Sequence, residues 1–285
     1  MRLPEWIRTT ARGQHSTRNL LRSRRLSTIC EEARCPNKGV CFSKPTAAFL
    51  IMGDRCTRSC AFCSVRNGAP ADLDAAEPGR VADAVFELGL RYVVITSVTR
   101  DDLPDGGASH FAATISSVKN LIGGAVRVEV LTPDFRGDSD ALGTVLSAGP
   151  DVFNHNIETI NRLYKVVRPQ ADYRRSLEVL RLVRMMMMPV MKTKSGIMLG
   201  LGETIEEVRE VLRDIRTTGC DFLTVGQYLR PAKKNLPVVE YVHPDIFESL
   251  KLYALGLGFE FVASGPLVRS SMNAEEMYTA GCIKK

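Results

Sequence analysis

The chain has 285 residues, of which 45% are hydrophobic and 25% charged, proportions ordinary for a globular protein. This length suits one large α/β barrel or two small domains, and the composition excludes a chain that is disordered as a whole. The longest stretch without Asp, Glu, Lys or Arg covers 13 residues, 106–118, which is too short to span a bilayer. We therefore expect no membrane association.

The positive charge is concentrated at the N-terminus. Residues 1–29 contain seven arginines and one glutamate, so they carry the whole net charge of +6 and leave a neutral body. We interpret this arm as an extension that packs over the body and helps to dock an acidic partner. Its Arg- and Ser/Thr-rich composition is also compatible with an organelle version of the protein. No apolar segment follows Met1, so secretion is not expected.

Apolar, β-branched runs alternate with helical patterns after residue 45. The expected strands are 47–52, 92–96, 127–131, 152–155, 197–199, 222–225 and 260–263. The expected helices are 79–89, 109–122, 139–148, 172–184, 204–218 and 245–256. Thr204 can cap one helix with Glu207, and Pro244 opens the last long one. This alternation predicts an α/β fold with a parallel sheet, either a full or a partial β/α barrel.

In such a barrel, the loops that follow the strands face the active site. One of these loops contains the trio Cys56, Cys60 and Cys63, which supplies three thiolates from eight residues. Three thiolates leave one iron of a four-iron cluster open for another ligand. A structural zinc site needs four ligands, and no His is near this loop. The trio therefore favours an iron–sulfur cluster over zinc.

A second trio, Cys30, Cys35 and Cys41, lies just upstream. Alone, it would fit buried structural thiols or a zinc knuckle as well as a cluster. Two trios in succession, each without a fourth cysteine, favour a second cluster. Cys220 precedes a strand and is expected in the core, and Cys282 is expected at an exposed terminus.

These motifs resemble those of a known family. The first trio, with Phe62 before its last cysteine, resembles the signature of radical S-adenosylmethionine (SAM) enzymes, and the second trio, within CEEARCPN (30–37), resembles the lipoyl synthases among them. Further segments that resemble the lipoyl synthases are RDDLPDGGA (100–108), FNHNIET (153–159), VRP (167–169), KSGIMLGLGE (194–203), GQYLRP (226–231) and GPLVRSS (265–271). Two positions depart from the family pattern, Met272 where Tyr is common and Thr99 where an acid is usual.

The resemblance implies a single partial (β/α)6 TIM-like barrel of the radical SAM type. Its parts would be an N-terminal extension (1–44) with the second trio, the barrel (45–264), and a C-terminal extension (265–285). The two extensions would cover the barrel mouth.

The resemblance also implies a sulfurtransferase. It would insert two sulfur atoms at C6 and C8 of an octanoyl group on a lysine, through a 5′-deoxyadenosyl radical and a sacrificial auxiliary 4Fe–4S cluster. Two 4Fe–4S clusters and SAM are the implied cofactors. The first cluster would be bound by Cys56, Cys60 and Cys63, and the auxiliary one by Cys30, Cys35, Cys41 and Ser271. The residues implied to contact SAM are Phe62, Thr96, Asn156, Glu158 and Arg168.

The implied substrates are octanoylated lipoyl carrier domains, namely the E2 subunits of 2-oxoacid dehydrogenases and the H protein of glycine cleavage. Further implied partners are an electron donor such as ferredoxin or flavodoxin, and an iron–sulfur carrier that rebuilds the auxiliary cluster. We expect a monomer in the cytoplasm, because clusters and free thiols need a reducing compartment.

Three other interpretations stay open from the residues alone. An RNA-directed methylthiotransferase would need an RNA-binding domain, for which no segment is long enough, so we expect no nucleic acid partner. A two-cluster electron carrier would not bind SAM, and a zinc-binding interaction protein would be colourless.

The run Met185–Met188 with Met191 is interpreted as adaptable core packing rather than a copper(I) site.

Overall fold

The computed structural model describes residues 3–7, 16–42, 48–187 and 191–283. The chain forms two compact units. The N-terminal unit comprises Thr9–Ser59 and Ser64–Phe153, and the C-terminal unit comprises Met1–Arg8, Cys60–Cys63 and Asn154–Lys285.

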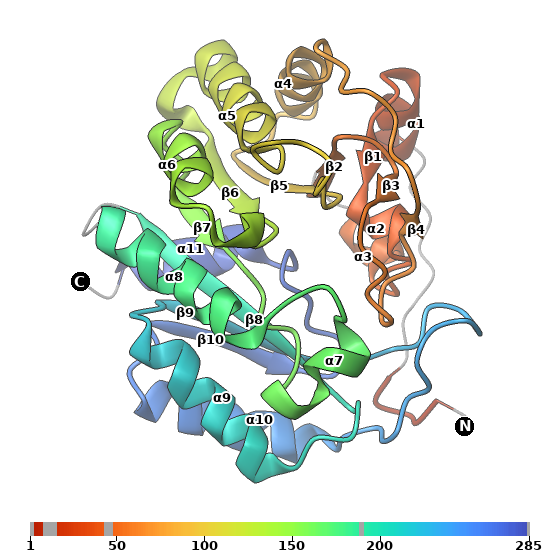
Figure 1. The fold of residues 1–285 in the computed structure, drawn as a ribbon, viewed down its shortest axis with the longest axis vertical. Coiled ribbons are helices and arrows are strands. Elements are labelled where there is room, and N and C mark those ends of the chain that lie inside the picture. Colours follow the sequence, from red (N-terminus) through yellow and green to blue (C-terminus); the bar gives the residue numbers. More distant parts are fainter. Residues whose placement is uncertain (1–2, 8–15, 43–47, 188–190, 284–285) are drawn as a thin grey trace. The chain divides into compact units, whose positions relative to one another are not determined.

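The N-terminal unit is a sheet covered by crossover helices. Its strands are β1 (Ser27–Thr28), β2 (Ala48–Ile51), β5 (Tyr92–Ser97), β6 (Arg127–Leu131) and β7 (Val152–Asn154), adjacent in that order. β2, β5 and β6 are parallel, and β1 runs antiparallel to β2. The helices α4 (Glu77–Glu87), α5 (Ala108–Ile122) and α6 (Ser139–Ser147) pack side by side along these strands (Figure 1). Every residue of β2 is buried, as expected for a covered parallel strand.

Several short elements precede or interrupt this pattern. They are α1 (Ser16–Ser23), α2 (Ile29–Glu32), α3 (Lys38–Cys41), β3 (Arg55–Cys56), β4 (Arg66–Asn67), η1 (Gly123–Ala125) and η2 (Phe135–Gly137). Leu21 of α1 is fully buried, and Arg24 forms ion pairs with Asp83 (3.0 Å) and Glu87 of α4. This part of the basic arm packs on the body, as expected, whereas residues 8–15 lie outside the described ranges.

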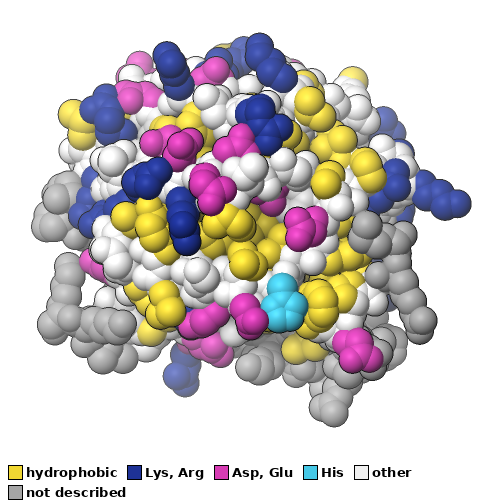
Figure 2. All heavy atoms as spheres, turned by 90° about the horizontal axis from the view of Figure 1, so that it is seen from below, with side chains coloured by type: hydrophobic (Ala, Val, Ile, Leu, Met, Phe, Trp, Pro, Cys, Tyr) yellow, Lys and Arg dark blue, Asp and Glu magenta, His cyan; other side chains and the backbone are white. Residues whose placement is uncertain are grey.

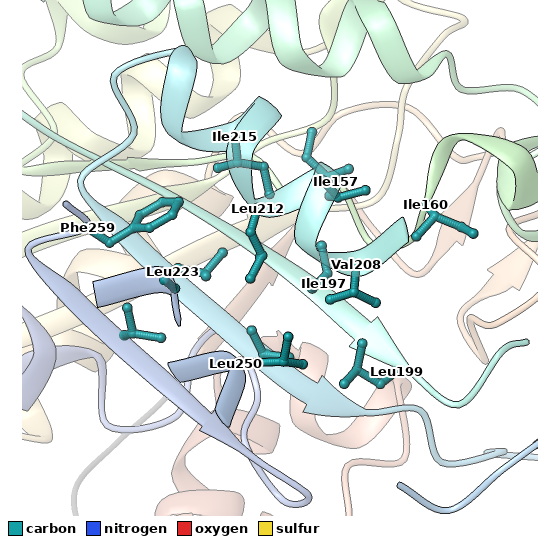
Figure 3. Close-up of a cluster of buried hydrophobic side chains, with 14 of the residues drawn as sticks. Ile157, Ile160, Ile197, Leu199, Val208, Leu212, Ile215, Leu223, Leu250 and Phe259 are labelled. Carbon is teal, nitrogen blue, oxygen red and sulfur yellow. The ribbon is translucent and has the colours of Figure 1, made fainter. Parts of the chain in front are cut away.

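The C-terminal unit contains the parallel strands β8 (Lys192–Leu199), β9 (Phe222–Gln227) and β10 (Phe261–Gly265). Its helices are η3 (Asn161–Leu163), α7 (Tyr164–Val167), α8 (Tyr173–Met187), α9 (Ile205–Thr217), α10 (Pro244–Gly256) and α11 (Ala274–Ile283). The apolar side of α9 faces the sheet, where Leu212 and Ile215 belong to one buried cluster with Ile197 and Leu223 (Figure 3). Burial of this face holds the helix on β8 and β9.

The alternation of strands and helices expected from the sequence is confirmed. β8, however, begins five residues before the expected 197. Its first half was not expected because it contains the polar but buried residues Thr193, Lys194 and Ser195. The cap of α9 by Thr204 and Glu207 and the opening of α10 by Pro244 are also confirmed.

The core interpretation of the methionine run is only partly right. Met191 is buried, but Met185 and Met186 are 66% and 42% exposed, so core packing is wrong for these two. They lie in the last turn of α8 that the structure describes, and Met188 lies outside the described residues. Cys220 is buried as expected, and the side chain of Cys282 is not among those described.

One face of the molecule has the mixture of charges expected of a body whose charges balance (Figure 2). On the face drawn in Figure 2, acidic, basic and apolar side chains are intermixed among the described residues. Within the described ranges, every helix is too short or too polar to cross a bilayer.

Leu212 tests how strongly the buried cluster stabilises the C-terminal unit. We expect Leu212→Ala to lower the free energy of unfolding by about 2–5 kcal/mol, because it leaves a cavity under α9. The matched control is Leu252→Ala on α10, a leucine that is 62% exposed, with an expected change below about 0.5 kcal/mol. Urea denaturation measures both, and equal losses would contradict the assignment of this core.

Glu207 gives the stability of the protein a predictable pH dependence. Its hydrogen bonds with the side chain of Arg162 and the backbone of Thr204 lower the pKa of Glu207 to about 2. A lowered pKa stabilises the fold above the carboxyl's ordinary pKa, and this stabilisation is lost as the pH falls toward 2. Because the ion pair is near the surface, we expect Glu207→Gln to cost only about 1 kcal/mol at neutral pH, shrinking on acidification. Urea denaturation across this range should show that dependence for Glu207→Gln and not for the control Glu206→Gln.

Candidate active site

In the N-terminal unit, the loop after β3 is fixed on the loop after β5. The backbone N–H of Thr99 donates a hydrogen bond to Sγ of Cys56 at 3.2 Å. Thr57 donates its backbone N–H (3.0 Å) and its hydroxyl (2.9 Å) to the carbonyl of Thr99, and that hydroxyl accepts from the N–H of Asp101. An N–H donor on sulfur suits a thiolate that ligates a cluster, because it stabilises the negative charge. Since the bond uses the backbone of Thr99, the departure from the family pattern at this side chain does not affect it.

Arg58, two residues after Cys56, is buried between two carboxylates. Its Nε and Nη2 donate to the two oxygens of Asp101 at 2.7 and 3.0 Å, and Nη2 also donates to Asp134 at 2.6 Å. The side chain of Arg58 is 4% exposed and that of Asp134 is 0% exposed. Burial opposes the charged form, but the hydrogen bonds to Asp101 and Asp134 outweigh it and raise the pKa of Arg58. The guanidinium therefore stays charged and clamps the loop in place.

The second trio also belongs to the N-terminal unit. Cys30 lies in α2, Cys41 ends α3, and the backbone N–H of Cys35 donates to the carbonyl of Cys30 at 3.0 Å. Burial, with the nearby thiols of Cys35 and Cys41, raises the pKa of the Cys30 thiol to about 12. All three are free thiols. A bound cation favours the thiolate form of such a buried thiol, as the binding of a cluster at this trio would require.

Among the residues that the structure describes, His, Cys, Asp and Glu side chains form no group of three around a single metal ion. A 4Fe–4S cluster takes one donor on each iron, so its cysteines do not share one metal atom.

In the C-terminal unit, several backbone contacts hold the segment Cys60–Cys63. The N–H of Ala61 donates to the carbonyl of Val167 at 2.9 Å, and the amide of Asn235 donates to the carbonyls of Cys63 (2.7 Å) and Ala61 (3.2 Å). Phe62 packs against a buried cluster of Val167, Leu201 and Tyr228. Sequence reasoning missed Asn235, which is 172 residues from Cys63 and carries no recognisable motif.

Three of the residues implied to contact SAM lie together in the C-terminal unit. Arg168 donates from Nη1 to the carbonyls of Asn156 (2.9 Å) and Ile157 (3.3 Å) and to the hydroxyl of Tyr164 (3.2 Å). The amide of Asn156 donates to the carboxylate of Glu158 at 3.1 Å. Burial raises the pKa of Glu158, while the charge of Arg168 and this hydrogen bond act against the rise. Arg168 thus shapes the loop on which Asn156 and Glu158 stand.

The other predicted site residues take separate places. Thr96 lies on β5 in the N-terminal unit, where its hydroxyl donates to the carbonyl of Leu131 at 2.9 Å. Ser271 is half-buried in the C-terminal unit, in a turn closed by a 2.9 Å hydrogen bond from the N–H of Met272 to the carbonyl of Arg269. The ligand and cofactor roles of these residues stay predictions.

Known proteins match the chain almost from end to end. The Radical SAM superfamily profile matches residues 50–215. The lipoyl synthase of Caldicellulosiruptor saccharolyticus is 54% identical over 276 residues, which cover 96% of each chain. The chain belongs to the lipoyl synthase family. The lipoyl synthase of Methylococcus capsulatus is 55% identical over 280 residues, covering 97% of this chain and 86% of its own.

Solved structures agree on the fold of this lipoyl synthase family member. Methylornithine synthase (PylB) matches with a TM-score of 0.56 at 16% identity, over 88% of this chain and 82% of its own. Streptococcus suis SuiB bound to S-adenosylmethionine matches with a TM-score of 0.60 at 11% identity, over 80% of this chain and 54% of its own. Together with the radical SAM match, these likenesses confirm the partial β/α barrel fold, and family membership confirms the radical SAM sulfurtransferase class, with SAM and 4Fe–4S clusters as its cofactors.

The Arg58 clamp makes a prediction about stability. We expect Arg58→Met to lower the free energy of unfolding by about 3–5 kcal/mol, because it leaves the buried carboxylate of Asp134 without its cation. The control is Arg181→Met, which removes an exposed ion pair with Glu178 and should leave the free energy of unfolding nearly unchanged. Urea denaturation of both variants measures the difference. A loss at Arg58 as small as that at Arg181 would show that the clamp does not hold the loop.

Proposed function

We propose that this chain inserts two sulfur atoms, at C6 and C8, into an octanoyl group that is amide-linked to a lysine of a lipoyl carrier domain. Family membership supports the proposal, since relatives named lipoyl synthase are 54–55% identical over about 96% of the chain. The observation that carries it is the second trio, whose thiols of Cys30, Cys35 and Cys41 lie near one another in the N-terminal unit. A second cluster at this trio would provide the sulfur that the proposed reaction consumes.

The first cluster would be bound by Cys56, Cys60 and Cys63, leaving one iron for SAM. When bound and reduced, this cluster together with SAM would supply the hydrogen-atom abstraction that an unactivated carbon requires. The chain's own residues orient it. Thr99 donates to the sulfur of Cys56, and Asn235 holds the backbone at Cys63. The residues proposed to contact SAM are Phe62, Thr96, Asn156, Glu158 and Arg168.

The auxiliary cluster would be bound by Cys30, Cys35 and Cys41, with Ser271 as its fourth ligand. A serine oxygen is a harder ligand than a thiolate and matches iron–sulfur chemistry less well. A weaker fourth bond is compatible with a cluster that gives up its sulfur. The extensions at residues 1–44 and 265–285 would bring these ligands to the barrel mouth.

The proposed substrates are the octanoylated E2 subunits of 2-oxoacid dehydrogenases and the H protein of glycine cleavage. A ferredoxin or flavodoxin would supply electrons, and an iron–sulfur carrier would rebuild the auxiliary cluster. We propose a cytoplasmic monomer, because the clusters and free thiols need a reducing compartment.

An anaerobic assay with cysteine variants tests the two cluster assignments separately. The protein is given SAM, a strong reductant and a peptide with octanoyl-lysine, and mass spectrometry follows 5′-deoxyadenosine and sulfur gain. We expect both products from the wild type. Cys60→Ala should give neither product, whereas Cys35→Ala should give 5′-deoxyadenosine without sulfur gain. Each variant should lose about half of its iron, because one of two clusters is removed.

Cys220→Ala is the matched control, since Cys220 is a buried cysteine outside both trios. It should keep both products and the full iron content. Sulfur gain by Cys35→Ala at the wild-type level would refute the auxiliary assignment. A wild type that holds both clusters and gives neither product would favour a two-cluster electron carrier instead.

A further inference from the structure

We propose that Asn156 is a positioning residue that fixes the turn carrying Ser271, through a hydrogen-bonded clasp with the neighbouring Ser270. The inference rests on the proposed function, in which Ser271 is the fourth ligand of the auxiliary cluster. It assigns different tasks to the two adjacent serines: Ser270 anchors the turn, and Ser271 is left to bind iron.

The clasp uses both ends of one amide. Nδ2 of Asn156 donates to Oγ of Ser270 at 2.8 Å, and Oγ of Ser270 donates to Oδ1 of Asn156 at 3.1 Å. Asn156 is buried and Ser270 is half-buried, so these bonds are partly shielded from competition with water. The same Nδ2 donates to Glu158, which further fixes the plane of the amide.

The anchored serine occupies a corner of a tight turn. The hydrogen bond from the N–H of Met272 to the carbonyl of Arg269 makes Ser270 and Ser271 the two central residues of a four-residue turn. A second turn precedes it, closed by the N–H of Val268 on the carbonyl of Gly265 at 3.1 Å. In a turn of this kind the two central residues share one peptide plane, so an anchor on Ser270 also restricts Ser271.

A glycine on β8 makes room for the clasp. A Cβ at Gly196 would overlap Oγ1 of Thr224 and lie 3.0 Å from Oδ1 of Asn156 and 3.1 Å from Oγ of Ser270. Gly226 on β9 likewise makes room for the backbone of the C-terminal segment, since a Cβ there would overlap the carbonyl of Val268. Both strands therefore lack side chains where the C-terminal segment lies against them, and the segment keeps a defined position.

Hydrogen exchange of the full-length, reconstituted protein tests the clasp directly. We expect Asn156→Ala and Ser270→Ala each to speed exchange of the amides in residues 265–273 by at least about fivefold, since the loss of one ordinary hydrogen bond has about this effect and the clasp contains two. The double variant should exchange no faster than either single variant, because both remove the same interaction. Asn161→Ala, at an exposed asparagine of the same unit, is the control and should change nothing. If the amides exchanged no faster in Asn156→Ala and Ser270→Ala than in the control, the proposed clasp would be contradicted.

Mössbauer spectroscopy in a Cys60→Ala background tests its connection to the cluster. Only the auxiliary cluster remains in this background, so an effect of Asn156 cannot arise through SAM. We expect Ser271→Ala to abolish the signature of one oxygen-ligated iron, and Asn156→Ala and Ser270→Ala to diminish it, with Asn161→Ala unchanged. Faster exchange with an intact iron signature in Asn156→Ala would overturn the positioning role. An unchanged signature in Ser271→Ala would instead refute the ligand assignment in the proposed function, whatever the exchange data show.

Discussion

The buried guanidinium of Arg58, shared between Asp101 and Asp134, fixes the loop on which Cys56 stands. That loop has little regular structure of its own, since β3 is only two residues long. A buried ion pair adds little net stability, because desolvation of the charges offsets much of their attraction. The ion pair instead restricts geometry, because a planar guanidinium that binds two carboxylates can take few orientations. The two carboxylates themselves come from loops that follow two parallel strands. The sheet therefore determines the position of the Cys56 sulfur through these two loops.

The C-terminal unit positions its loops mainly with hydrogen bonds to backbone atoms rather than with a buried ion pair. The carbonyl of Val167 accepts a hydrogen bond from the N–H of Ala61. Arg168 donates to the carbonyls of Asn156 and Ile157, and the amide of Asn156 donates to Ser270. Segments far apart in the sequence therefore form one connected network, in which most bonds end on backbone atoms. Such a network specifies where loops lie rather than which side chains they display. This explains why motifs such as VRP and GPLVRSS contain residues that need not touch a substrate.

The sequence predicted the parts of this arrangement that depend on periodicity and on local chemistry. Alternating apolar patterns report which faces are buried, and the pair Thr204 and Glu207 reports a helix start, so both were found without a structure. The early half of β8 was missed because Lys194 and Ser195 are polar and yet buried, and periodicity counts polar residues as exposed. The partners of the cysteine loops were missed for a different reason. Asn235 and Asp134 act on residues 172 and 76 positions away, and such contacts leave no local pattern in a single sequence.

The backbone of Glu158 is strained, and hydrogen bonds to β8 maintain this conformation. Its φ of 69° lies in the left-handed region, which costs a residue other than glycine about 1 kcal/mol or more. The conformation persists because β8 grips the backbone on both sides: the N–H of Glu158 donates to the carbonyl of Gly196 at 2.9 Å, and its carbonyl accepts from Met198 at 2.8 Å. This grip turns the carboxylate toward Asn156 and close to the charge of Arg168. Burial still raises the pKa of Glu158, so a bound hydroxyl that donates to the carboxylate would favour its ionised form. A glycine at this position would adopt the same conformation at less strain, so the presence of an acid beside Arg168 is consistent with the role in SAM binding proposed for Glu158.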